Sequence, residues 1–496
     1  MNGKLVIKYL NVIVTFICLL GCATKEEEIT PPNIIYILAD QWRAQDMGYA
    51  GNSDVQTPNL DQLAQQSVVF TNAVSGCPVC SPHRASLLTG QYPLTHGVFY
   101  NDKPLRNEAL TIAEVFKEEG YQTAYIGKWH VNGRRENETV QESRNAPVPQ
   151  ERRQGFDFWK VNECTHDYNN SFYYDENDEK HFWEGYDAFA QTDMAIRYMQ
   201  EHREGNPFFL FLAWGPPHAP YHTAPEEFSN KYGEEDVTLR ANIPREYEEV
   251  ARKQIAGYYA HIAALDQALG ELLQALKDNN LEEHTMVVFT SDHGDMLWSH
   301  GMEKKQKPWD ESILVPLLIH YPAVLGTEAK RIETPMNTPD IMPTLLGLSK
   351  VSIPSTVEGK DFSPLLSNNA QSAMDSAALI QCPVPFHQWN YLQGGREYRG
   401  VRTPRYTYVR DLQGPWLLYD NFKDPYQQNN LCNQPDHAEI QEKLEQQLQQ
   451  KLTATHDEFL PGDAYMQQWG YTYDQKDSIR EILIEQLERM REANQP

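Results

Sequence analysis

The chain has 496 residues, with 43 Lys plus Arg, 69 Asp plus Glu and a formal net charge of −26. This length exceeds the size at which one hydrophobic core stops growing, so it predicts two domains or one large domain with an appendage. The acidic balance argues against nucleic acid as a partner, because nucleic-acid-binding domains present basic surfaces.

The N-terminus predicts an export signal. Lys4 and Lys8 precede an apolar run at residues 12–20, which is too short to span a bilayer at about 20 residues per helix. The run ends in Leu19-Leu20-Gly21-Cys22, which is similar to the bacterial lipobox. That similarity implies cleavage before Cys22 and attachment of a lipid to it, and an ordinary signal peptide is the alternative.

A lipid on Cys22 would anchor the exported protein to a membrane. We therefore expect a lipoprotein signal peptide at residues 1–21 and a solvated tether at residues 22–32. The expected location is the bacterial envelope, either in the periplasm or on the outer-membrane surface.

Residues 33–39 form a continuous apolar run, which is typical of a strand buried on both faces of a parallel sheet. Helical patterns follow at residues 104–119 and 247–277. Further apolar runs alternate with them at residues 123–126, 208–214, 285–290 and 315–319. This alternation predicts an α/β fold with a mostly parallel central sheet flanked by helices, in a domain at residues 33–370.

The sequence changes character after residue 366. Residues 367–376 are polar, and strand-like stretches follow at residues 377–381 and 399–410. Apolar residues about four positions apart predict two closing helices, one with Ile440, Leu444, Leu448 and Leu452 and one with Ile479, Leu483, Leu487 and Met490. We therefore expect a smaller α+β subdomain at residues 371–496.

Reactive side chains follow four of the predicted strands. Because ligands of open α/β sheets bind beyond the carboxyl ends of the strands, we expect these side chains to share one site. They are Asp40-Gln41, Lys128-Trp129-His130, His218 and Asp292-His293. The set Asp40, Gln41, Asp292 and His293 is rich in oxygen ligands, which favours calcium or magnesium over zinc.

The stretch Cys80-Ser81-Pro82-His83-Arg84 predicts an anion-binding nucleophile. If a helix begins at Cys80 or Ser81, Pro82 falls in its first turn, and Cys80 and Arg84 share a face. The free N–H groups of that turn favour an anion, and the positive charge of Arg84 lowers a thiol pKa. A zinc or redox pair of Cys77 with Cys80 is the alternative, but no second ligand pair follows it.

These residues together resemble the formylglycine-dependent sulfatases of the alkaline-phosphatase-like superfamily. In that family a Cys-x-Pro-x-Arg pattern is followed closely by Thr-Gly, as Cys80 to Arg84 is followed here by Thr89-Gly90. The resemblance extends over most of the chain. Its other segments are Asn33 to Asp40, Gly127 to His130, Ser291 to Ser312, Gly400 to Thr403, Tyr406 to Val409 and Leu418 to Leu431.

The resemblance implies a sulfate ester hydrolase in which Cys80 is oxidised to formylglycine and one calcium ion is bound, with magnesium less favoured. The metal ligands would be Asp40, Gln41, Cys80, Asp292 and His293. The hydrated residue at position 80 would attack the sulfur and release the alcohol. His130 would then deprotonate the remaining hydroxyl so that sulfate leaves. His218 and Lys305 would act on the leaving group, with His218 as general acid, while Lys128 and Arg84 hold the sulfate oxygens.

The sequence departs from the common family pattern at three positions. Gln41 stands where many relatives have aspartate, His293 where many have asparagine, and His83 where the modification motif more often has serine. Lys305 is chosen over Lys304 and Lys307 because it keeps a spacing of five residues from His300.

The expected substrate is a sulfated carbohydrate, either a polysaccharide or its oligosaccharides, because an exported lipoprotein meets such polymers. The expected protein partner is a formylglycine-generating or radical maturation enzyme. Two alternatives stay open: a phosphonate monoester or phosphodiester hydrolase on the same scaffold, and a non-catalytic glycan-binding lipoprotein. The candidates for further substrate contacts are Arg134, Arg135, Arg152, Arg153, His387, Trp389, Arg396 and Arg399. For the two arginine pairs, a solvated loop face is the alternative.

Overall fold

The computed structural model describes residues 31–135, 137–368 and 377–473. The chain divides into two units, residues 1–31 and 32–496, and all elements given below belong to the second. The expected signal peptide and most of the tether lie outside the described residues, as does the predicted helix with Ile479 to Met490. Within the described residues no helix is long and apolar enough to cross a membrane.

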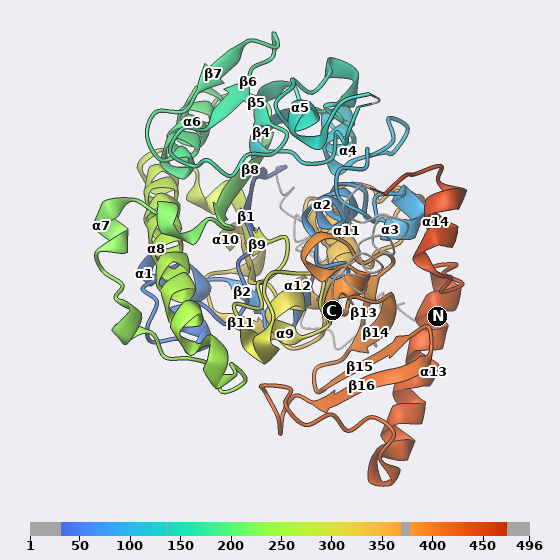
Figure 1. Ribbon diagram of the computed structural model, residues 1–496. Coiled ribbons are helices and arrows are strands. Elements are labelled where there is room, and N and C mark those ends of the chain that lie inside the picture. The colour runs from blue at the N-terminus through green and yellow to red at the C-terminus, as the bar shows by residue number, and fades with distance from the viewer. Residues whose placement is uncertain (1–30, 136, 369–376, 474–496) are drawn as a thin grey trace, which may run out of the picture. The chain divides into compact units, whose positions relative to one another are not determined.

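A ten-stranded mixed sheet forms the centre of the second unit (Figure 1). Its middle strands, from β9 to β5 in spatial order, are all parallel, and on either side they pair with one antiparallel strand, β10 or β6. The spatial order is β11 (Lys330–Ile332), β2 (Val68–Phe70), β10 (Leu317–His320), β9 (Thr285–Ser291), β1 (Asn33–Asp40), β8 (Phe208–Pro217), β4 (Gln122–Lys128), β5 (Phe158–Asn162), β6 (Phe172–Tyr174) and β7 (Lys180–Phe182).

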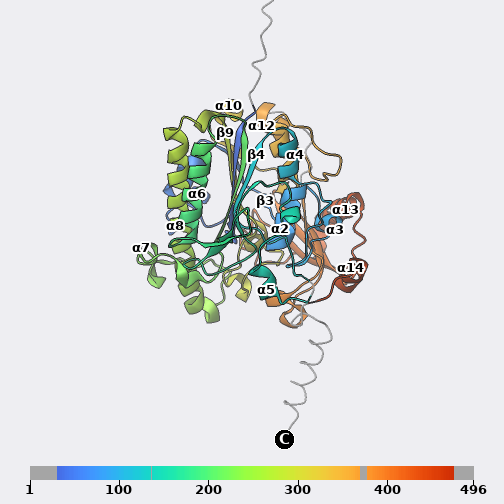
Figure 2. The same cartoon turned by 90° about the horizontal axis from the view of Figure 1, so that it is seen from above.

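Helices cover both faces of this sheet, as Figure 2 shows. The alternation of β1 explains the two layers, because Ile35 and Ile37 pack into one apolar cluster while Ile34 and Tyr36 pack into the other. The first cluster includes residues of α1 (Pro58–Ala64), α6 (Asp187–Glu201), α7 (Glu226–Ser229) and α8 (Glu248–Asp278). The second includes residues of α2 (Cys80–Thr89), α4 (Ile112–Glu118), α10 (Pro322–Leu325), α11 (Thr338–Leu348) and α12 (Ser363–Asn368).

A separate four-stranded antiparallel sheet follows in the C-terminal part. Its strands are β13 (Ala378–Cys382), β14 (Tyr398–Arg402), β15 (Tyr406–Asp411) and β16 (Gly414–Asp420). Helix α13 (Ala438–Ala454) packs Leu444, Leu448 and Leu452 against this sheet. The remaining elements are short: α3 (Pro93–His96), α5 (Val140–Arg144), α9 (Asp310–Ile313), α14 (Gly462–Gln468) and the paired strands β3 (Ala73–Val74) and β12 (Met336–Asn337).

The predicted fold class is confirmed, with differences in detail. The run at residues 315–319 forms β10, which pairs antiparallel with β9, so the sheet is mixed. The helix predicted at residues 104–119 covers only α4, because Thr111 and Glu114 form a capping box that starts the helix at Ile112. The stretch 399–410 is a hairpin of β14 and β15 and not one strand.

Candidate active site

The predicted reactive residues meet at one edge of the sheet. Asp40 ends β1, Lys128 ends β4, and Asp292 directly follows β9. His218 directly follows β8. Because these four strands are neighbours and run parallel, their carboxyl ends converge, and the side chains that follow them come together as the sequence predicts.

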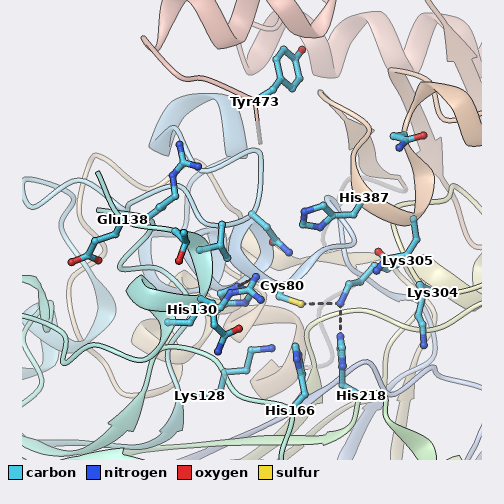
Figure 3. Close-up of a pocket in the computed structure, with 18 of the residues that line it drawn as sticks. Cys80, Lys128, His130, Glu138, His166, His218, Lys304, Lys305, His387 and Tyr473 are labelled. Carbon is cyan, nitrogen blue, oxygen red and sulfur yellow. Dashed lines mark hydrogen bonds between the residues drawn. The ribbon is translucent and has the colours of Figure 1, made fainter. Parts of the chain in front are cut away.

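Cys80 is the first residue of helix α2, as expected from the position of Pro82. Its side chain is almost fully buried. The Cys80 Sγ atom lies 3.1 Å from Lys305 Nζ, 3.2 Å from His293 Nε2 and 3.8 Å from Asp40 Oδ1. Figure 3 shows Lys305 between Cys80 and His218, with dashed lines to both. The thiol therefore lies next to an ammonium group, an imidazole ring and a carboxylate.

Four residues form a cluster that could hold a metal ion. One ligand atom from each of Asp40, Cys80, Asp292 and His293 lies within 4.8 Å of the others, and all four side chains are buried. Two buried carboxylates side by side repel each other unless a cation lies between them, and burial followed by the charge of Asp40 raises the pKa of Asp292 to about 6. The two carboxylates of this cluster supply hard oxygen donors, which fit a divalent cation.

Two further cations approach the same carboxylates. The Arg84 guanidinium lies 3.2 Å from Asp40 and 3.3 Å from Asp292, while the Lys128 ammonium lies 2.6 Å from Asp40. Burial alone would raise the pKa of Asp40, but Lys128 and the other nearby positive groups hold it well below the usual value. The Arg84 guanidinium also donates to the Lys128 carbonyl at 2.7 Å, so the two cations form one buried unit.

The charge around Cys80 favours an anion at this position. Burial and the carboxylate of Asp40 would each raise the pKa of the thiol, yet Lys305, Lys128 and His293 hold it well below the usual value. The Ser81 amide, in the first turn of α2, is already bonded to Asn101 Oδ1 at 3.1 Å. The side-chain cations therefore carry most of the attraction for an anion at Cys80.

His218 and Lys305 form a pair beside Cys80. The Lys305 ammonium donates to His218 Nε2 at 2.9 Å, and His218 Nδ1 donates to the Ala219 carbonyl at 2.8 Å. Burial and the positive charge of Lys305 lower the pKa of His218 well below its usual value. The His166 ring stacks on His218 with centroids 4.3 Å apart. His218 is therefore a neutral imidazole, held between the Lys305 ammonium and the Ala219 carbonyl.

His130 belongs to a second charged group at the pocket wall. Its Nε2 lies 3.4 Å from Asp102 Oδ1, and Arg144 binds both oxygens of the same carboxylate at 2.9 and 2.8 Å. Burial alone would lower the pKa of His130, but the negative charge of the Cys164 thiolate and the hydrogen bond to Asp102 raise it to about 9. His130 is thus oriented by Asp102 and charged at neutral pH in the cysteine form of the protein.

Lys305 is the lysine that reaches the site. Of the two neighbours weighed against it, Lys304 donates to the Tyr221 hydroxyl at 2.8 Å and Lys307 donates to the Glu303 carbonyl at 2.6 Å. Gln41 also turns toward this lysine, because its Oε1 lies 3.1 Å from Lys305 Nζ. The residues predicted for catalysis or metal binding therefore form one cluster around Cys80, and His130 lines the same pocket.

A pocket of about 1160 Å³ opens above this group. It is large enough for several sugar units, because drug-sized ligands fill about 300–1,000 Å³. Figure 3 shows Cys80, Lys128 and His130 on one side and His387 and Tyr473 on the other. The remaining lining residues are Asn101, Arg134, Glu138, Thr139, Val140, Gln141, Arg144, His166, His218, Lys304, Lys305, Gln388, Asn390 and Gln393.

The expected substrate contacts outside the centre divide into two groups. Arg134 and His387 line the pocket. The other six do not line it and have structural contacts instead. Arg135 contacts Glu138, Arg152 contacts Asn132, Arg153 contacts Asp178, Arg396 contacts Asp411, Arg399 contacts Asp457, and Trp389 is buried in an apolar cluster.

Sequence reasoning missed Asp102, Arg144 and His166. His166 comes four residues after strand β5, but that strand is not apparent from the sequence. Residues 158–162 are too short and too mixed in character to be recognised as a buried strand. Asp102 and Arg144 have no local signal, since they come from a loop and a short helix that only the fold brings to His130.

Comparisons with known proteins agree with this geometry. The family model described as Sulfatase matches residues 32–351, and the model described as N-sulphoglucosamine sulphohydrolase, C-terminal, matches residues 299–454. An ulvan-active sulfatase of Formosa agariphila is 44% identical, over 94% of this chain and 91% of that protein. An endo-4-O-sulfatase of Bacteroides thetaiotaomicron is 32% identical, over 83% of this chain and 90% of that protein.

A solved structure from work on the metabolism of multiple glycosaminoglycans by Bacteroides thetaiotaomicron is also similar. It has a TM-score of 0.79 and 31% identity, over 86% of this chain and 97% of that one. The fold and the cluster around Cys80 thus define an enzyme of the alkaline-phosphatase-like superfamily. Within it, the chain belongs to the sulfatase family, whose members hydrolyse sulfate esters. This confirms the enzyme interpretation over the glycan-binding lipoprotein.

Proposed function

We propose that this sulfatase acts on a sulfated carbohydrate, either a polysaccharide or oligosaccharides derived from it. The observation that carries the proposal is the position of Cys80, at the start of α2 and at the floor of a pocket of about 1160 Å³. Two relatives support the choice of substrate, since one is described as ulvan-active and another as an endo-4-O-sulfatase.

Cys80 is proposed to be converted to formylglycine, whose hydrated aldehyde supplies the nucleophile. Residues 80–84 are all buried in the folded chain. A maturation enzyme, either formylglycine-generating or of the radical type, would therefore have to act on residue 80 before α2 packs into the fold. Loss of the thiol at position 80 also removes one of the interactions that raise the pKa of His130, which brings His130 closer to the range of a general base.

A calcium ion is proposed for the cluster of Asp40, Asp292 and His293, with the amide oxygen of Gln41 and residue 80 as the other ligands. Calcium is preferred to magnesium because the cluster offers many protein ligands, whereas magnesium usually keeps several waters. When bound, the ion supplies positive charge that attracts the sulfate and the nucleophile. The surrounding chain excludes water, because every member of the cluster is buried.

The remaining residues have roles that follow from their contacts. Lys128 and Arg84 hold positive charge at the carboxylates beside residue 80, where it offsets the charge that develops on the sulfate oxygens. Lys305 and His218 share one proton and are placed to give it to the leaving alcohol oxygen. His130, held by Asp102, is placed to remove the proton of the remaining hydroxyl on residue 80, and sulfate then leaves.

The location of the protein is proposed from its N-terminal sequence. The ending Leu-Leu-Gly-Cys supports a lipid on Cys22 and attachment to a membrane of the bacterial envelope. A sulfatase anchored there would meet sulfated polymers outside the cytoplasm. Palmitate labelling of the protein in a bacterial host, with Cys22→Ala as the control, tests the anchor.

Parallel assays on sulfate esters and phosphate diesters test the proposed reaction. We expect sulfate release from sulfated oligosaccharides, and turnover of a phosphodiester or phosphonate monoester at least about a hundredfold slower in kcat/KM, a difference of about 2.7 kcal/mol. Equal or faster hydrolysis of the phosphorus esters would contradict the proposal and favour the alternative activity.

A further inference from the structure

Gln41 differs chemically from the other residues of the proposed cation cluster. A carboxylate presents two equivalent oxygens, whereas an amide presents one oxygen, which accepts, and one NH₂ group, which only donates. Only the oxygen can bind a cation. A glutamine in this position therefore needs a neighbour whose hydrogen bond fixes which end of its amide faces the cluster.

Asp295 is placed to make that decision. Gln41 Nε2 donates to Asp295 Oδ2 at 2.6 Å, and the Tyr221 hydroxyl donates to the same oxygen. The backbone N–H groups of Leu297 and Lys304 both donate to Oδ1, each at 2.9 Å. All four partners are donors, so Asp295 is an acceptor-only carboxylate. The end of Gln41 that touches it has to be the NH₂ group.

The opposite end of the amide is fixed independently. Gln41 Oε1 lies 3.1 Å from the ammonium of Lys305, which can only donate, and the same ammonium lies 3.1 Å from Cys80 Sγ. The Gln41 backbone is held as well, because its N–H donates to Asp292 Oδ1 at 3.0 Å and its carbonyl accepts from Tyr258 at 2.7 Å. A flipped amide would place oxygen against a carboxylate and NH₂ against an ammonium.

We infer that Asp295 is a positioning residue for the cation site, which fixes the Gln41 amide with its oxygen toward the cluster of Asp40, Cys80 and Asp292. Asp295 is buried and does not line the pocket, so it acts through Gln41 and not on the substrate. The inference rests on the proposed function only in requiring a divalent cation at the cluster.

The amide of Gln41 and the carboxylate of Asp295 can be exchanged between the two positions with little change in side-chain shape. In Asp295→Asn the two backbone N–H groups hold the introduced amide oxygen at the Oδ1 position, so its NH₂ group faces Gln41 Nε2. Two donors then oppose each other, and the Gln41 amide turns its oxygen away from the cluster. In Gln41→Glu two carboxylates oppose each other. The double variant Gln41→Glu/Asp295→Asn restores one donor against one acceptor and leaves an oxygen facing the cluster.

Calcium binding to the four proteins tests the inference. Each is stripped with a chelator, carries the same residue at position 80 as checked by mass, and is titrated with Ca²⁺ in a calorimeter. We expect Asp295→Asn and Gln41→Glu each to raise the Kd by about 10–100-fold, as is usual when a partner of a metal ligand is lost. The double variant should recover at least about tenfold relative to Asp295→Asn.

Asp266→Asn is the matched control, because Asp266 is another buried carboxylate that accepts two backbone N–H bonds, from Asn59 and Leu60, outside the cluster. Its Kd for Ca²⁺ should equal that of the unchanged protein. If Asp295→Asn alone does not fold, comparing the Kd for Ca²⁺ of Gln41→Glu with that of the double variant still tests the inference.

An unchanged Kd in Asp295→Asn, or a double variant that binds no better than Gln41→Glu, would overturn the inference while leaving the proposed function intact. If the unchanged protein binds no divalent cation but releases sulfate, the inference and the cation proposal both fail and the sulfatase activity stands.

Discussion

Cys77 and Cys80 lie three positions apart in the sequence, but the pKa values of their thiols are shifted in opposite directions. Both are buried and free of disulfides. Burial raises the pKa of Cys77 to about 12, and its side chain packs with Phe99 and Phe386 in an apolar cluster. The pKa of Cys80 is held low by the cations around it. The two thiols therefore lie in different environments, and of the two only Cys80 belongs to the site.

Substitution of Cys80 by serine separates folding from turnover. A Cys80→Ser protein should fold, bind Ca²⁺ and bind substrate, but show no measurable sulfate release. Serine has one hydroxyl where hydrated formylglycine has two, so no second hydroxyl can drive sulfate from the enzyme. Calorimetry measures binding and ion chromatography measures free sulfate. Cys77→Ala is the control and should keep activity, and repeated turnover by Cys80→Ser would refute the assigned role.

Asp187 gives a prediction about stability and pH. Burial raises its pKa in the folded protein to about 8, above the ordinary value of 3.8. Between these values the folded state binds more protons than the unfolded state, so stability falls as pH rises, by up to about 1.4 kcal/mol per pH unit. Asp187→Asn should therefore raise the free energy of unfolding at pH 8 and leave it nearly unchanged at pH 4. Urea unfolding at both pH values measures this, and an equal effect at both would contradict the assignment.

Among the helices and strands, those with long apolar runs were predictable from the sequence, whereas short strands of mixed polarity were not. The apolar runs that became β1, β8 and β9 were recognised because both of their faces are buried. Strands β5, β6 and β7 were missed, since three to five mixed residues carry no clear period. The site residues after strand ends were found by their position, whereas Asp102 and Asp295 act through contacts that only the tertiary structure creates.

The segment after helix α14 forms part of the pocket. Tyr473 lines the pocket, and its hydroxyl donates to Asp463 at 2.6 Å. The Lys103 ammonium donates to the Thr472 carbonyl at 2.7 Å, which ties this segment to the loop that carries Asp102. Asp463, Thr472 and Tyr473 lie beyond the stretch matched by either family model. A pocket wall formed by this segment would contact the sugar units of the substrate and not its sulfate group.

Removal of the Tyr473 ring should therefore affect large substrates only. We expect Tyr473→Ala to raise the KM for a sulfated oligosaccharide about tenfold, which is about 1.4 kcal/mol, with kcat unchanged. Hydrolysis of a small aryl sulfate should not change. Tyr473→Phe keeps the ring and should resemble the unchanged protein. Equal losses on both substrates would show that the ring supports the site and not the sugar.

For the whole molecule, the net charge of −26 opposes the approach of an anionic polymer. The cations Arg84, Lys128 and Lys305 are concentrated at the carboxylate cluster, and the remaining charge is distributed over the chain. Exposed charges are screened beyond about 8 Å at physiological salt, while buried pairs are screened much less. The site therefore attracts the substrate at short range although the whole protein repels it at long range.

Ionic strength separates these two effects. Because the Debye length falls from about 30 Å at 0.01 M salt to about 8 Å at 0.15 M, the long-range repulsion should weaken over this range. We expect the KM for a polysulfated substrate to fall as salt rises to 0.15 M, and the KM for a small, singly charged sulfate ester to change less. Steady-state kinetics measures both, and a rising KM for the polymer would show that surface attraction dominates.

We propose that the protein removes sulfate from carbohydrates by means of a modified Cys80. The most direct test incubates the protein, produced in a host that makes formylglycine, with a panel of defined sulfated oligosaccharides and reads each product by mass. We expect at least one member of the panel to lose a single sulfate, and Cys80→Ala to abolish the loss. A panel left unchanged by protein whose residue 80 is shown to be formylglycine, or desulfation that survives Cys80→Ala, would contradict this proposal.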